Sequence, residues 1–257
     1  MSFFDSIHLS LSIFISIAMA LLAALVLKND RRSATNLTFG ALCFVTMGWL
    51  LMTYISSRPD LLYAYLPLAR FTIFFAPPQS LAFFLLVHTI PSKTFRLRQT
   101  HLFGLFSLTL LVMALTLTSA VFSGVRFDGN HAVLIPSFGM PIFVGFVSFF
   151  SIGAVVVLIR KMRKAVAVEK KQLRTMLIGI LVMLGLIIST IMIPIIFLQS
   201  DTFLPFAPVY VFVFLVMTAI AILRYQLFDI RLIATEFLVT VLGLALLFEG
   251  VSSSSVP

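Results

Sequence analysis

The sequence predicts an all-α, polytopic membrane protein with about eight transmembrane helices and its amino terminus outside. Of its 257 residues, 61% are hydrophobic and only 11% are charged, which leaves too few polar side chains to cover a soluble domain. Apolar runs near the roughly 20 residues that cross a bilayer recur along the whole chain. Fifteen of the 18 Lys and Arg residues lie in alternate connections and only two in the others, an asymmetry that places the basic connections in the cytoplasm.

The eight apolar runs are each expected to be helices, because backbone polar groups in lipid must find hydrogen bonds within their own segment. In chain order they are Ile7–Leu27, Leu37–Ser57, Leu61–His88, Leu102–Phe122, Pro141–Ile159, Met176–Leu198, Leu204–Leu223 and Leu232–Phe248. The first run is expected to be a retained helix. Asp5 precedes it and the basic residues Lys28, Arg31 and Arg32 follow it, which is the reverse of a cleavable signal peptide.

Prolines interrupt two of these helices. Pro67 suits the first turn of the third helix, whereas the adjacent Pro77 and Pro78 fall in mid-membrane and are expected to kink or break it. Pro194 is expected to act in the same way on the sixth helix. The eighth run is the shortest and has Glu236 near its cytoplasmic end, so a crossing helix and a helix lying at the interface both remain open.

The longest outer connection, Ser123–Met140, contains Asp128 and Gly129 between two short apolar stretches. An Asp-Gly pair favours the positive φ values of a two-residue hairpin turn, so we expect a β-hairpin here. The longest cytoplasmic connection is the loop Arg160–Arg174, which contains seven Lys and Arg residues. Anchoring of the topology and contact with anionic headgroups account for its charge.

Several function classes find no support. The net charge of +9 does not indicate a nucleic-acid partner, because the basic residues are spread among short connections. Cys43 is the single cysteine and the four histidines are scattered, so no metal site, cofactor or catalytic group is predicted.

Arg70 is the clearest charged residue within a span. In one interpretation its side chain reaches outward to the nearby membrane surface. In the other it faces the bundle and pairs with an anionic ligand, with Tyr54, Trp49 and Gln79 as neighbours if the second and third helices pack together. These four residues are the candidate ligand contacts.

The segment Ala221–Glu236, with the sequence AILRYQLFDIRLIATE, is the most distinctive motif of the chain. It resembles the end of the seven-transmembrane sensor region of bacterial membrane histidine kinases, in a branch that continues into further hydrophobic helices. Pro77 with Phe83 and Phe84, and the stretch Lys171–Arg174, are similar to the third and sixth helices of that family. The resemblance implies that residues which couple the signal lie in this segment, namely Arg224, Tyr225, Phe228, Asp229 and Glu236.

The resemblance implies a sensory input module of a histidine kinase, in the bacterial cytoplasmic membrane. Residues 1–230 would form the seven-helix sensor bundle, and residues 231–257 an eighth helix with a truncated outer loop. The phosphoacceptor helix and ATP-binding domain are missing, so the chain is expected to be a fragment without enzyme activity. Expected partners are the lipid bilayer, a small apolar or anionic ligand, the kinase domain of the parent chain and a second copy. The alternatives are a transporter or channel subunit, which would need intramembrane charge pairs and an inverted repeat, and a membrane enzyme acting on lipid.

Overall fold

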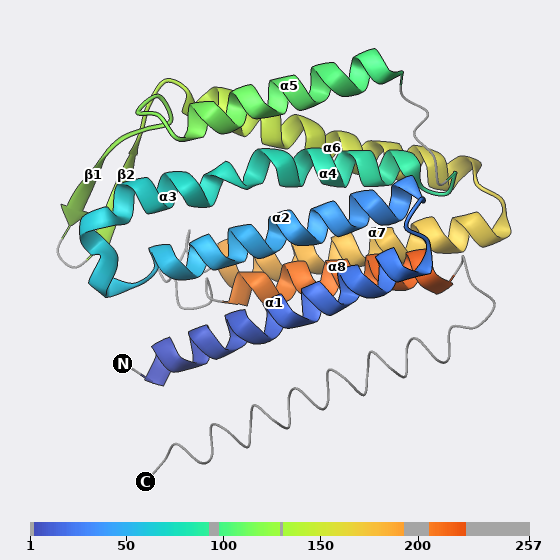
Figure 1. The fold of residues 1–257 in the computed structure, drawn as a ribbon, viewed down its shortest axis with the longest axis horizontal. Coiled ribbons are helices and arrows are strands. Elements are labelled where there is room, and N and C mark those ends of the chain that lie inside the picture. Colours follow the sequence, from blue (N-terminus) through green and yellow to red (C-terminus); the bar gives the residue numbers. More distant parts are fainter. Residues whose placement is uncertain (1–2, 93–97, 129–130, 193–205, 225–257) are drawn as a thin grey trace, which may run out of the picture. The chain divides into compact units, whose positions relative to one another are not determined.

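The computed structural model describes residues 3–92, 98–128, 131–192 and 206–224 (Figure 1). Six helices in these ranges are long and apolar enough to cross a membrane, and Ala207–Leu223 is a shorter apolar helix. This confirms the all-α polytopic prediction. The first seven predicted runs each coincide with a helical segment, while the eighth, Leu232–Phe248, lies outside the described residues. Contacts divide the chain into two compact units, Met1–Asp30 with Val166–Pro257 (unit 1) and Arg31–Ala165 (unit 2).

Unit 1 contains α1 (Phe3–Asn29), α7 (Ala167–Ile187), the short π-helical turn η2 (Ile188–Met192) and α8 (Ala207–Arg224). The α8 helix packs against both α1 and α7. A Cβ added to Gly179 of α7 would lie 2.8 Å from Cβ of Met217 in α8. Glycine therefore allows these two helices their close approach, as small residues do in membrane helix pairs. Pro194, the predicted break, lies outside the described residues.

Unit 2 is built around one central helix. Its elements are α2 (Ala34–Ser56), the 3₁₀ helix η1 (Pro59–Ala64), α3 (Tyr65–Phe74), α4 (Ala76–Thr89), α5 (Gln99–Thr116), β1 (Phe122–Asp128), β2 (His131–Pro136) and α6 (Met140–Lys164). The α4 helix packs against α2, α5 and α6 (Figure 1). A buried cluster joins Leu81 and Leu85 of α4 to Val112 of α5 and to Phe146 and Phe150 of α6.

The third span is broken in its middle, as the proline pair predicts. The α3 helix ends at Phe74 and α4 begins at Ala76, with prolines in the first turn of α4. A proline at this position removes only an N–H that would lack a helical partner anyway. The ring of Phe75, between the two helices, fills the space beside Gly48 of α2, where an added Cβ would lie 2.4 Å from Cε1 of the ring.

The fourth helix is shorter than the sequence indicates. The apolar run extends to Phe122, but α5 ends at Thr116 and Phe122 is the first residue of β1. Thr116 and Thr118 each donate a hydrogen bond of 2.7 Å to a carbonyl three residues earlier, which provides an alternative to further helical pairing. Residues 117–121 form turns, and only Phe122 of this run belongs to the hairpin.

The predicted hairpin is confirmed, because β1 and β2 pair antiparallel. Asp128 pairs with His131, so Asp128 belongs to the strand and the connection starts one residue later than the Asp-Gly prediction. The prediction that Arg160–Arg174 forms a loop is wrong, because all of these residues except Ala165 and Val166 belong to α6 or α7. Lys, Arg, Glu and Gln are good helix formers, and they extend both helices beyond their apolar parts.

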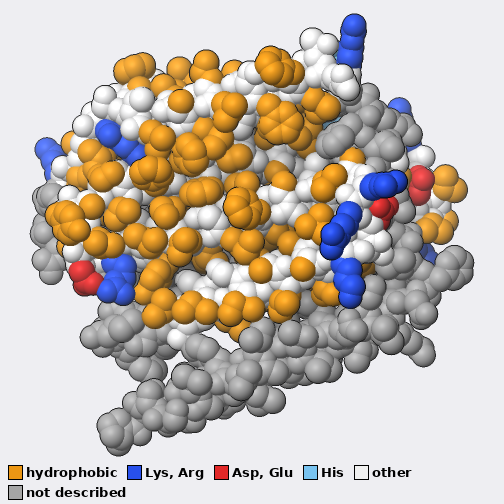
Figure 2. All heavy atoms as spheres, viewed as in Figure 1, with side chains coloured by type: hydrophobic (Ala, Val, Ile, Leu, Met, Phe, Trp, Pro, Cys, Tyr) orange, Lys and Arg blue, Asp and Glu red, His pale blue; other side chains and the backbone are white. Residues whose placement is uncertain are grey.

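On the face seen in Figure 2, hydrophobic side chains cover a broad continuous surface and far outnumber the Lys and Arg side chains. Phe103 and Leu110 of α5 are 76% and 64% exposed, and Phe44 of α2 is 72% exposed. Large apolar side chains exposed in such numbers are typical of a surface that faces lipid.

Candidate functional site

Arg70 lies in the last half of α3 and ties that helix to the hairpin. Its Nη2 donates a hydrogen bond to the backbone carbonyl of Phe122 in β1, and its buried Nε has no hydrogen-bond partner. The guanidinium is half-buried, and the carbonyl oxygen replaces part of the water that this burial removes from it. Neither sequence interpretation anticipated this contact, because 52 residues separate the two partners.

Tyr54, another candidate ligand contact, makes its side-chain hydrogen bond with a different arginine. The Tyr54 hydroxyl accepts a hydrogen bond of 3.2 Å from Nη1 of Arg58, not from Arg70. Arg58 also donates a hydrogen bond to the carboxylate of Asp60. This second hydrogen bond raises the pKa of the Arg58 guanidinium above its ordinary value. Among the described residues, no hydrogen bond joins Arg70 to Tyr54, Trp49 or Gln79.

The α2 and α3 helices do pack together, as the ligand hypothesis requires. Their polar contact is the pair of hydroxyls on Ser56 and Thr72, whose oxygens lie 3.4 Å apart. Tyr54 is two residues from Ser56, which places it about 200° away around the helix. Tyr54 therefore lies on the face of α2 opposite to Ser56, and Arg70, Trp49 and Gln79 are the other three candidate residues. Their role in ligand binding stays a prediction.

Lys161 donates three hydrogen bonds to backbone carbonyls at the end of another helix, whereas sequence reasoning counted it only as a topology anchor. Its ammonium donates hydrogen bonds to the carbonyls of Val87 and His88, both at 2.7 Å, and to the carbonyl of Ile90. These three acceptors end α4, whereas Lys161 lies on α6. We refer to this contact as the latch. A single cation thus binds the broken third span to another helix.

The latch completes the cap at the end of α4. The last carbonyls of a helix have no partner within the helix, and inside or near lipid each unpaired group is costly. The Leu86 carbonyl accepts hydrogen bonds from the Ile90 N–H and the Thr89 hydroxyl, at 3.2 and 2.8 Å. The Thr89 carbonyl accepts one from the Ser92 hydroxyl at 3.2 Å. Lys161 supplies the remaining donors, and a positive charge there also complements the helix dipole.

The expected signal-coupling segment lies almost wholly outside the described residues. Arg224 is the last residue of α8, and Tyr225, Phe228, Asp229 and Glu236 follow beyond it. Their coupling role stays a prediction. In the described ranges, no three His, Cys, Asp or Glu side chains are grouped so that they could hold a metal ion.

Comparison with known proteins assigns the chain to a family. The family profile described as the N-terminal 7TM region of histidine kinase matches residues 9–231, a range that begins within α1 and includes the described elements from α2 to α8. None of the curated proteins compared with the chain matches it. The several apolar helices long enough to cross a membrane agree with this match. The chain belongs to the family of N-terminal seven-transmembrane regions of histidine kinases, and it is the transmembrane sensory input region of such a kinase.

Proposed function

We propose that this region detects its stimulus by repacking around the break in the third span, and that the latch transmits the change to the kinase. In this proposal the chain itself carries no catalytic step, and phosphorylation belongs to the kinase domain of the parent polypeptide. The intact protein would act as a homodimer in a bacterial cytoplasmic membrane. The transporter and lipid-enzyme alternatives have no observation in their favour among the described residues.

The break supplies an element with two possible arrangements. The α3 and α4 helices are separated by Phe75 alone, so a small change at that residue alters the angle between them. The ring of Phe75 packs on Gly48 and lies edge-on to the Phe74 ring, with centroids 5.6 Å apart. A close-packed contact of this kind switches between discrete packings more readily than it deforms gradually.

The latch is the observation that carries the proposal. It fixes the far end of α4 to α6 through three carbonyls of one helix end. After α6, only Ala165 and Val166 separate Lys164 from α7, so a movement of α6 reaches the next helix through a short, direct connection. A movement of α4 would therefore reach the later helices, whose last member leads into the predicted coupling segment.

Substitution of the latch tests this mechanism in the full-length kinase reconstituted in lipid vesicles. Methionine has a side chain of similar length but no hydrogen-bond donor, so Lys161→Met should lower the free energy of unfolding by about 1–3 kcal/mol because buried carbonyls lose their partner. Lys161→Arg keeps the donors. Lys164→Met is the matched control, since Lys164 lies on the same helix and is exposed.

We expect Lys161→Met to change basal autophosphorylation at least about fivefold, the lower end of the range for coupled sites. Lys161→Arg should restore most of the wild-type rate, and Lys164→Met should match the wild type. The folded fraction of each variant is measured in parallel by size-exclusion chromatography. A folded Lys161→Met protein with the wild-type rate would refute the latch as a transmitting element.

A further inference from the structure

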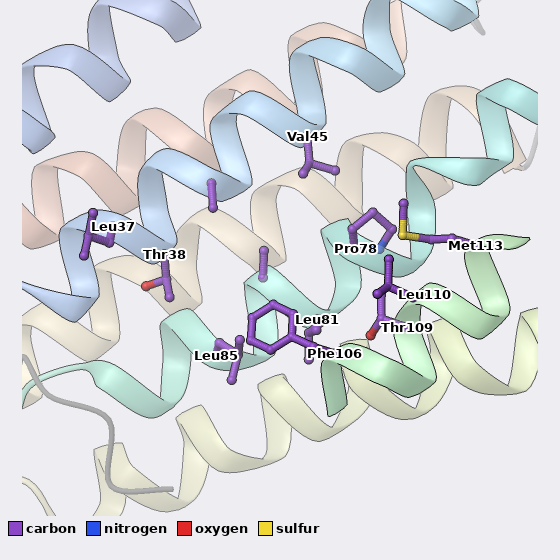
Figure 3. Close-up of a pocket in the computed structure, with 12 residues that line it drawn as sticks. Leu37, Thr38, Val45, Pro78, Leu81, Leu85, Phe106, Thr109, Leu110 and Met113 are labelled. Carbon is purple, nitrogen blue, oxygen red and sulfur yellow. The ribbon is translucent and has the colours of Figure 1, made fainter. Parts of the chain in front are cut away.

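An apolar groove runs along unit 2 between α2, α4 and α5, with a cavity volume of about 360 Å³ (Figure 3). That volume falls in the range of about 300–1,000 Å³ found for small-molecule sites. Val45, Pro78 and Met113 line it at one end, and Leu37 and Phe106 lie toward the other (Figure 3). One end is therefore next to the break in the third span, because Pro78 belongs to the first turn of α4.

The shape of the groove fits a chain that lies parallel to the helices. Its lining extends from Pro78 to Leu85 on α4 and from Phe106 to Met113 on α5. Seven residues of helix correspond to about 10 Å at 1.5 Å per residue. The groove therefore extends about 10 Å along the helices, which is the direction in which lipid chains run if these helices cross a bilayer.

The chemistry of the walls admits hydrocarbon only. Thr38 and Thr109 are the two hydroxyl-bearing residues of the lining. Thr38 Oγ1 donates to the Ala34 carbonyl and Thr109 Oγ1 to the Leu105 carbonyl, both at 2.7 Å. Both hydroxyls therefore already donate to carbonyls of their own helices. The rest of the wall consists of apolar side chains. A polar group placed in the groove would remain without a partner.

The groove is continuous with the lipid-facing surface of α5. Phe106 and Leu110 line it and are still 53% and 64% exposed, so an occupant can enter sideways from the bilayer. Positive charge lies at the end away from the break: Arg98 is the N-cap of α5, and Arg31 shortly precedes α2. Both arginines are exposed, and such residues attract anionic headgroups at the cytoplasmic face.

We propose that this groove is a binding site for one acyl chain of an anionic phospholipid from the predicted cytoplasmic leaflet. The chain fills the groove up to Pro78, and the headgroup lies near Arg31 and Arg98. An occupied groove supports α4 beside the break, so its occupancy would bias the angle between α3 and α4. The sensory role of the bound lipid rests on the proposed function, whereas the binding of the lipid does not.

Photolabelling of the intact protein in vesicles tests the binding. The vesicles contain a trace of phosphatidylglycerol with a photoreactive diazirine on its acyl chain, and labelled peptides are located by mass spectrometry. Parallel samples use the same probe chain on phosphatidylcholine and on a free fatty acid. We expect phosphatidylglycerol to label the groove-lining stretches of α2, α4 and α5 more strongly than either of the other probes.

Ala41→Leu fills the groove, because Ala41 lines it and its small side chain faces open space. It should lower this labelling at least about tenfold, the effect of losing about two buried CH₂ groups of the lipid chain. Ala114→Leu is the matched control, since Ala114 is exposed on α5 but does not line the groove. Val45→Phe replaces Ala41→Leu if the latter does not fold.

Three results would overturn the proposal: equal labelling of Ala41→Leu and Ala114→Leu, equal labelling by the two phospholipids, and preferential labelling by the fatty acid. The first would mean ordinary boundary lipid, and the last a soluble amphiphile as ligand. Because no kinase activity is measured, these outcomes are independent of the latch experiment. A lipid-filled groove with an inert latch would refute only the proposed function.

Discussion

Gly48→Ala tests the packing at the break most simply, because it adds a single methyl group. The new Cβ would lie 2.4 Å from Cε1 of Phe75, whereas ordinary contacts begin at 3.4 Å. The ring must therefore move by about 1 Å, and overpacking of this size typically costs about 1–3 kcal/mol. Alanine also favours a helix by about 0.8–1 kcal/mol over glycine, so the packing penalty must be separated from that gain.

Gly104→Ala provides the reference. Gly104 lies on α5, and a Cβ added there would meet nothing within 4 Å. The free energy of unfolding is measured for both variants by SDS titration in mixed micelles. We expect Gly48→Ala to be less stable than Gly104→Ala by about 1–3 kcal/mol, the packing term alone.

Phe75→Leu completes a double-mutant cycle with Gly48→Ala. With the ring shortened, the extra methyl group should have space, so Gly48→Ala should cost little in the Phe75→Leu background. The coupling energy between the two sites should then be about 1–3 kcal/mol, in the range observed for residues in contact. Equal stability of Gly48→Ala and Gly104→Ala, or additive effects in the cycle, would refute the tight contact at the break.

Further predictions concern the remaining polar contacts. Arg70→Met removes the donor to the Phe122 carbonyl, so amide hydrogen exchange in β1 and β2 should become faster. Unchanged exchange would mean that other contacts hold the hairpin. Thr190 Oγ1 and the Tyr210 hydroxyl lie 2.7 Å apart in unit 1, so Tyr210→Phe should lower stability by about 1 kcal/mol and should have little further effect in a Thr190→Val background. Asp229→Ala in the full-length kinase should change signalling output more than expression, and equal losses of both would leave Asp229 a folding role only.

Features with a local chemical cause were predictable from the sequence. Hydropathy located the spans because lipid demands about 20 apolar residues per helix. Pro77 and Pro78 predicted the break because proline lacks the N–H that a helix interior needs. A short motif indicated the family that the profile match confirms, whereas the orientation derived from the charge asymmetry stays a prediction.

Contacts between residues that are far apart in the sequence could not be predicted in this way. The latch joins residues more than 70 positions apart, and nothing near Lys161 distinguishes it from the other basic residues of its segment. The Gly48 contact with Phe75 is likewise a matter of packing between helices. Hydropathy also placed the end of the fourth helix at Phe122 and not at Thr116, because the turn residues after the helix include the apolar Leu117, Ala120 and Val121.

The response of the full-length kinase to anionic lipid tests the central claim most directly. Autophosphorylation is measured in vesicles of pure phosphatidylcholine and in vesicles that also contain phosphatidylglycerol, for the wild type, Lys161→Met and Lys164→Met. We predict that the wild type and Lys164→Met change their rates with lipid composition at least about fivefold, while folded Lys161→Met, still labelled in its groove, does not respond. A Lys161→Met kinase that responds like the wild type would contradict the claim that the latch carries the signal from the broken span.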